Sequence, residues 1–97
     1  MKLVLLHDAQ VEFWESVEYY ERKRTGLGIR FKQEIDLFLE KIQASPLLPR
    51  LREGGYRRVN LSIFQHYIAY VIQDDVLLIV AICHSRQKPG FWLDRLP

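Results

Sequence analysis

Residues 76–92 read VLLIVAICHSRQKPGFW, and this stretch decides the architecture that the rest of the chain must satisfy. Its first eight residues are apolar at every position, a pattern typical of a central strand that is covered on both faces. Because side chains alternate along a strand, two sets of residues are expected to face opposite ways. They are Val76, Leu78, Val80, Ile82 and His84 on one face, and Leu77, Ile79, Ala81 and Cys83 on the other.

Three residues that can carry positive charge follow this strand at alternating positions: His84, Arg86 and Lys88. Pro89 comes next, and proline cannot donate a hydrogen bond to a central ladder. The strand is therefore expected to leave the sheet here, with the cationic side chains at the point where it emerges.

Three further strands are predicted from short apolar or β-branched runs at residues 2–6, 56–61 and 64–72. Gly54-Gly55 precedes the second run, and the turn-forming Gln73-Asp74-Asp75 separates the third from the apolar strand. In the run YRRVNL, Arg57 and Arg58 must point to opposite faces, so one of them is expected to share a face with His84.

Two helices are predicted between the first and second strands. Residues 9–24 contain neither Gly nor Pro, carry Phe13, Val17 and Tyr20 on one stripe, and follow Asp8, a suitable N-cap. Residues 27–44 form the second helix, whose apolar stripe is Leu27, Phe31, Ile35, Phe38, Leu39 and Ile42. The short connection around Gly26 predicts an antiparallel helical hairpin.

The resulting order, β-α-α-β-β-β, predicts a single α+β domain over residues 1–97. The N-terminal helical hairpin is expected to pack on one face of a twisted, mostly antiparallel four-stranded sheet. The other face must stay solvated or be covered by another segment.

Composition excludes several classes of protein. The only cysteine is Cys83, so the chain has no internal disulfide and no multi-cysteine metal site, in keeping with a cytoplasmic protein. No apolar window reaches the ~18 residues of a membrane span, and no signal peptide is visible. The sequence has no nucleophile elbow and no glycine-rich phosphate loop, which excludes familiar hydrolases, kinases and dinucleotide-binding enzymes.

Positive charge concentrates in the second half of the chain. Residues 1–49 hold seven Lys/Arg against eight Asp/Glu, whereas residues 50–97 hold seven against four. Such a basic surface can attract phosphates. It can equally be a solvated surface or a docking patch for an acidic partner.

The residue types near the emerging strand suit metal-free RNA cleavage. His84 can act as acid or base, and Arg58 with Arg86 can clamp a phosphate. Lys88 can add charge, while Tyr67 or Tyr70 can stack on a base.

A structural role is the alternative for each of these residues. His84 can fasten the C-terminal segment, Arg57 or Arg58 can pair with Glu53, and Tyr70 can belong to the core. Phe91 and Trp92 can fold back over the apolar edge, anchored by the indole N–H. A metal site made of His7, His66 and His84 is disfavoured, because no two of them have the spacing of ligands.

Three stretches of the chain resemble the RelE/ParE toxin superfamily of bacterial type II toxin–antitoxin modules. The first runs through Ala9, Glu12, Glu18-Tyr19-Tyr20-Glu21, Gly26-Leu27-Gly28 and Phe31; the second is Arg57-Arg58-Val59 with Phe64 and Tyr70; the third is residues 81–92. The chain departs from the pattern at Phe64-Gln65-His66, where many relatives read Phe-Pro-Tyr, and at Arg86-Gln87, where many carry two arginines.

The resemblance implies a cytoplasmic toxin that needs no cofactor or metal and forms a hetero-oligomer with a cognate antitoxin. The antitoxin arm is expected to dock across the helices and an open sheet face. RelE-like members cut mRNA on the ribosome, and the expected catalytic residues are then Arg58, His84 and Arg86, with Arg57, Lys88, Tyr67 and Trp92 contacting nucleic acid or target. ParE-like members inhibit DNA gyrase without catalysis, and residues 84–95 are then the contact surface. We expect the ribosome-dependent mRNA endonuclease, with gyrase inhibition as the alternative.

Overall fold

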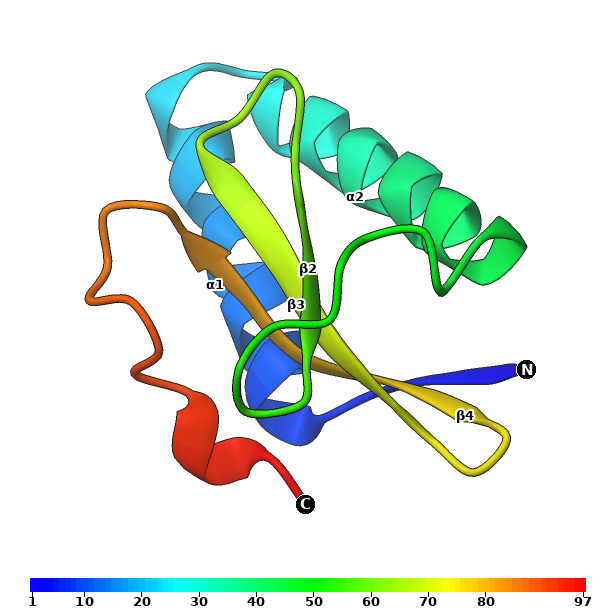
Figure 1. The fold of residues 1–97 in the computed structure, drawn as a ribbon. Helices are drawn as coiled ribbons and strands as arrows, with labels where there is room; N and C mark the ends of the chain where they lie inside the picture. Colours follow the sequence, from blue (N-terminus) through cyan, green and yellow to red (C-terminus); the bar gives the residue numbers. More distant parts are fainter.

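The computed structural model describes all residues from Met1 to Pro97. Its elements follow the predicted order, and Figure 1 shows the two helices lying together beside the strands. They are β1 (Lys2–Leu5), α1 (His7–Lys23), α2 (Leu27–Ala44), β2 (Arg57–Asn60), β3 (His66–Gln73), β4 (Val76–His84) and the 3-10 helix η1 (Leu93–Arg95).

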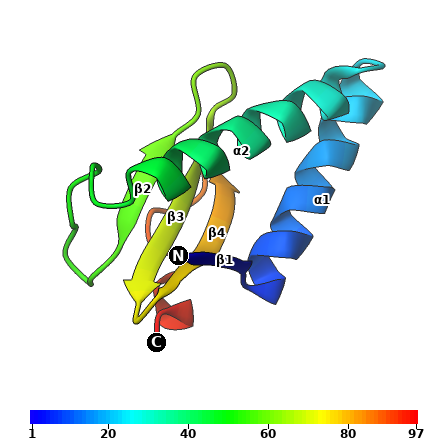
Figure 2. The same ribbon diagram turned by 90° about the vertical axis from the view of Figure 1, so that its right-hand side faces the viewer.

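The four strands form one sheet in the order β1-β4-β3-β2. β4 is central: it pairs in parallel with β1 and antiparallel with β3, which in turn pairs antiparallel with β2. Figure 2 shows both helices on the same side of this sheet. The predicted α+β fold is therefore confirmed, with one parallel strand pair.

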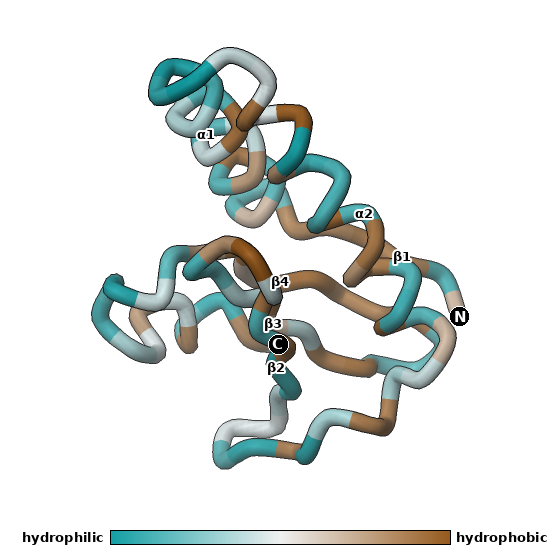
Figure 3. Tube along the Cα trace, turned by 90° about the horizontal axis from the view of Figure 1, so that it is seen from above, coloured by the Kyte–Doolittle hydropathy of each residue, from teal (hydrophilic) through white to brown (hydrophobic).

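The principal core lies between the helical hairpin and the sheet. Figure 3 shows hydrophobic colour along β4 and on parts of α2, with the hairpin to one side of the strands. The fully buried members come from every layer, and the largest are Phe31, Ile35, Ile42, Ile68, Tyr70, Leu77, Ile79 and Ile82. Tyr70 is a core residue, as its structural interpretation predicts, and its hydroxyl donates to the Pro46 carbonyl at 2.6 Å.

A second, smaller core covers the opposite face of the sheet. Tyr67, Ala69, Val71, Val80, Ala81 and Cys83 form this core with Trp92. The segment after β4 turns back across the sheet, and the Trp92 indole N–H donates to the Tyr67 hydroxyl at 2.8 Å. The predicted fold-back of Trp92 and its N–H anchor are confirmed, so this face is neither open nor solvated.

Strict alternation along residues 76–84 is wrong, because β4 contains an irregularity. Ala69 pairs with Ala81 but its neighbour Tyr70 pairs with Ile79, which leaves Val80 as an extra residue in β4. Leu77, Ile79 and Ile82 consequently belong to the helix-side core, whereas Val80, Ala81 and Cys83 belong to the second core. The bulge lets both faces stay apolar while changing which residues share a face.

The hairpin between the helices requires two glycines. Gly26 has φ of +89°, and a β-carbon added at Gly28 would lie 2.6 Å from the Val17 carbonyl oxygen of α1. The Glu21 carboxylate accepts from the backbone N–H groups of Gly26 and Gly28 at 2.9 and 3.0 Å. The start of α1 differs from the prediction: Leu6 occupies the N-cap position without a side-chain bond, and Asp8 lies in the first turn.

Neither α1 nor α2 combines the length and apolarity needed to cross a lipid bilayer.

Replacing Gly28 with alanine should destabilise the protein by ~1–3 kcal/mol, because the added methyl group forces two helix backbones apart. Urea unfolding followed by circular dichroism measures this change. Gln33→Ala, at an exposed position of the same helix, is the control and should change the free energy of unfolding by less than ~0.5 kcal/mol. An equal stability of Gly28→Ala and the wild type would contradict the close approach.

Candidate functional site

The edge of β4 that faces α1 loses its strand partner half-way along its length. β1 ends at Leu5, and its last bond to β4 runs from the Leu6 N–H to the Ile79 carbonyl at 2.9 Å. Beyond this point, buried backbone groups of β4 need other partners. Side chains supply them: Arg95 Nη1 donates to the Val80 carbonyl at 3.1 Å, and Glu12 Oε1 accepts from the Ile82 N–H at 3.1 Å.

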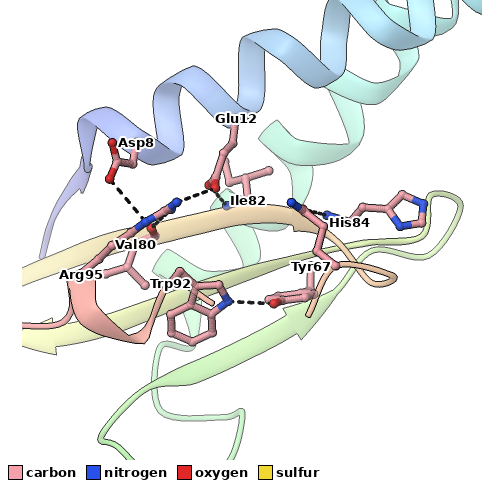
Figure 4. A network of polar contacts seen from close by, with 9 residues as sticks. Asp8, Glu12, Tyr67, Val80, Ile82, His84, Trp92 and Arg95 are labelled. Atoms are coloured by element: carbon pink, nitrogen blue, oxygen red, sulfur yellow. Dashed lines mark hydrogen bonds and ion pairs between the residues drawn. The ribbon is translucent and has the colours of Figure 1, made fainter. Parts of the chain in front are cut away.

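Glu12 and Arg95 also bind each other, and Figure 4 shows this pair bridging α1, β4 and the C-terminal segment. Arg95 Nη2 donates to Glu12 Oε2 at 2.9 Å, and Arg95 Nε lies 3.4 Å from Asp8 Oδ2. Both members of the Glu12–Arg95 pair are less than one-fifth exposed. The hydrogen bond to Glu12 raises the pKa of Arg95, so the guanidinium stays charged.

Arg58 lies on the sheet face that carries the second core. It pairs with Ala69, and its guanidinium carbon lies 3.8 Å from the centre of the Tyr67 ring. Its Nε donates to Asn60 Oδ1 at 3.1 Å.

Tyr67 and Trp92 are only 2% and 1% exposed, so neither ring is available to a nucleic acid or a target protein. Burial, above all, raises the pKa of the Tyr67 hydroxyl to about 12, which keeps it neutral. The prediction of these two residues as contact residues is corrected: they fasten the C-terminal segment to the sheet.

His84 lies on the opposite, helix-side face. It pairs with His66 across the β3–β4 ladder, and the two ring centres are 5.0 Å apart. The His84 side chain organises the loop that follows β4, because its Nδ1 accepts from the Arg86 N–H at 3.0 Å. Gln87 Oε1 accepts from the His84 N–H at 3.1 Å, which closes the same loop.

A groove of about 400 Å³ runs beside His84, between α1 and the end of β4. Its lining mixes charged, neutral polar and apolar residues: Glu12, Glu15, Ser16, Tyr19, Arg22, His66, Ile82, Cys83, His84 and Gln87. No group of three or more potential ligands converges there or elsewhere to hold a metal ion.

The predicted convergence of Arg58 with His84 is wrong. The register places His84 with His66 and Arg58 with Ala69, three residues along β3, and an odd separation puts the two side chains on opposite faces. Arg57 is the arginine that shares the His84 face. It pairs with Tyr70, about 13 Å along β3 from His66, and donates to the Pro49 carbonyl at 2.9 Å.

Arg86 and Lys88 are the two predicted residues that remain free. Both are exposed in the loop that follows β4, and neither forms an ion pair. The arrangement therefore offers a basic loop on the surface, while Arg57, Arg58 and Arg95 each form a hydrogen bond with another group of the domain.

Sequence reasoning does not find the Glu12–Arg95 pair. The partners are separated by 83 residues, and each resembles an ordinary surface charge in the sequence. One feature of the sequence points to this pair. Glu12 follows Asp8 by four residues in the first predicted helix, so the two carboxylates lie on the same helix face.

Comparisons with known proteins agree with this architecture. The family model described as "ParE toxin of type II toxin-antitoxin system, parDE" matches residues 4–89. Among solved structures, the chain is similar to one described as "Chromosomal ParDE TA system from P. aeruginosa", with a TM-score of 0.77 and 17% identity over 87% of this chain and 95% of that one. At this identity the likeness shows the fold alone. No curated protein sequence matches the chain.

His66 should make stability depend on pH. The ring is 4% exposed, with the Tyr20 hydroxyl 3.3 Å from Nδ1 and the Ser16 hydroxyl 3.4 Å from Nε2. Burial, together with the neighbouring His84, lowers the pKa of His66 to about 4 from 6.5, so the ring is neutral in the folded protein. The neutral ring therefore contributes fully to the free energy of unfolding above the unfolded pKa of about 6.5. This contribution is lost as the pH falls toward 4.

Between pH 7 and pH 4.5 we expect a loss of about 2 kcal/mol from this group in urea unfolding. His66→Gln removes the titrating ring while all carboxylates stay the same. The variant should therefore lose about 2 kcal/mol less than the wild type over this range. If the free energies of unfolding of the two proteins change equally with pH, His66 is not the group responsible.

Proposed function

This chain belongs to the ParE toxin family of type II toxin–antitoxin systems, and we propose that it arrests growth by binding DNA gyrase rather than by cutting RNA. It is the toxin component of such a module and has a cognate antitoxin as partner. The proposal concerns the target and the mode of action, and it replaces the mRNA endonuclease favoured from sequence with the ParE-like alternative.

One observation carries the proposal: Arg58 and His84 lie on opposite faces of the sheet. RNA cleavage without a metal requires an acid, a base and cations gathered around one phosphate. Here the guanidinium of Arg58 stacks on buried Tyr67, and the Nδ1 of His84 is occupied by the Arg86 backbone. Arg58 and His84 thus have separate structural partners, which favours a toxin that acts by contact.

The contact surface that we assign to gyrase is the loop of residues 85–89, in the first half of the segment proposed from sequence. All five residues are exposed, and the loop carries Arg86 and Lys88 free of acidic partners. The two bonds to His84 restrict the loop, which lowers the entropy cost of binding. An ordered basic loop suits an acidic surface on the target.

The expected docking of the antitoxin across an open sheet face is not supported. The C-terminal segment already covers the second face, with Trp92 buried against Tyr67. The outer surfaces of the helices remain accessible, and they expose large apolar side chains such as Trp14 and Ile29, which are 55% and 60% exposed. We therefore place the antitoxin arm along the helical hairpin.

A gyrase supercoiling assay with purified toxin tests the proposal. The wild type should inhibit supercoiling, and Arg86→Ala/Lys88→Ala should inhibit about tenfold less well, because two charged contacts are lost. Arg30→Ala/Lys32→Ala removes two exposed cations from α2 and should inhibit like the wild type.

Programmed ribosomes provide the opposing test. Wild-type toxin should leave their mRNA uncut. Cleavage of the mRNA that disappears with His84→Ala, together with normal gyrase activity, would mean that the nuclease alternative is correct.

A further inference from the structure

The chain after β4 is held at both ends, and its far end is fixed by one partly buried ion pair. We infer that Glu12 and Arg95 are positioning residues for the toxic activity: they set the place of the contact loop 85–89 without touching the target. This inference rests on the proposed function and deepens it by naming residues that the loop itself does not contain.

The path of the chain after β4 connects the contact loop to η1. Residues 85–90 leave the sheet at His84, pass through a turn at Gly90 with φ of +76°, and reach η1 at Leu93. Local backbone bonds link the two parts, from the Phe91 N–H to the Lys88 carbonyl at 3.3 Å and from the Leu93 N–H to the Gly90 carbonyl at 3.0 Å. A shift of η1 is therefore transmitted to the end of the contact loop.

Bonds from the Arg95 side chain hold η1 in place. Arg95 is its last residue, and its guanidinium reaches α1 through Glu12 and β4 through the Val80 carbonyl. These bonds join three parts of the molecule at the place where β4 has no strand partner. Without Arg95, the Val80 carbonyl and the Glu12 carboxylate both lose a partly buried charged donor.

Glu12 and Arg95 position the C-terminal segment but do not belong to the principal core. The principal core between the helices and the sheet contains neither Glu12 nor Arg95, and no residue of η1 is buried. Loss of the pair should therefore release the C-terminal segment while the helix-side core stays folded. Trp92 reports this release, because it is 1% exposed and packs on the sheet next to η1.

The first measurement is acrylamide quenching of Trp92 in a Trp14→Phe background, where Trp92 is the only tryptophan. Arg95→Ala should raise the quenching constant severalfold, with an unchanged helical circular dichroism spectrum. Glu12→Gln is the milder variant, because its remaining carbonyl still accepts from the Ile82 N–H. Arg95→Lys keeps the charge and should restore part of the shielding. Lys32→Ala is the matched control, since it breaks a 2.9 Å ion pair on an exposed part of α2.

The second measurement is activity, followed both as gyrase inhibition and as growth arrest on induction in cells. Arg95→Ala should lose at least about tenfold in inhibition, and Arg95→Lys should recover part of it. Gly90→Ala displaces the same segment without a change of charge, because its β-carbon would lie 2.8 Å from Leu93 Cδ1 at a positive φ. It should reproduce the loss, whereas Gly55→Ala, with φ of +86° and open space around it, should not.

Two results would overturn the inference. One is a shielded Trp92 in Arg95→Ala, which would mean that the pair does not hold the segment. The other is a released Trp92 with full growth arrest, which would mean that the position of the loop does not matter. A wild type that arrests growth but leaves gyrase active would refute the proposed target only, and growth arrest by the variants would then decide the positioning role.

Discussion

The structure depends on how the free edge of β4 is satisfied where β1 ends. A central strand buried on both faces cannot leave backbone groups without hydrogen-bond partners. The Glu12 carboxylate and the Arg95 guanidinium fill these positions at Ile82 and Val80 and neutralise each other. Because Arg95 comes from the last turn of the chain, the same bonds bring the C-terminal segment onto the sheet and allow Trp92 to bury the second face.

The register of the strands divides the functional candidates between the two faces of the sheet. On the helix side, His84 meets His66 and organises the following loop. On the other side, Arg58 stacks on Tyr67. These residue types match those of a nuclease, but their separation by the sheet favours a toxin that acts through its surface.

The basic excess in the second half of the chain therefore has two different uses. Arg57, Arg58 and Arg95 each bind a carbonyl, an aromatic ring or a carboxylate within the domain. Arg86 and Lys88 have no such partner and remain on an ordered loop. A modest net charge of +2 is thus compatible with a locally basic contact surface, because most of the other charges are paired or dispersed.

The helices and strands and their order follow from local patterns in the sequence. The stripe from Leu27 to Ile42 predicts α2 with its observed bounds, and the apolar run from Val76 predicts a strand covered on both faces. Even the return of Trp92 could be predicted, because a buried indole needs a partner for its N–H. The face that each candidate residue occupies and the charges that meet depend on long-range contacts. One extra residue in β4 changes the alternation, and Glu12 finds Arg95 across 83 positions, neither of which leaves a periodic signal in the chain.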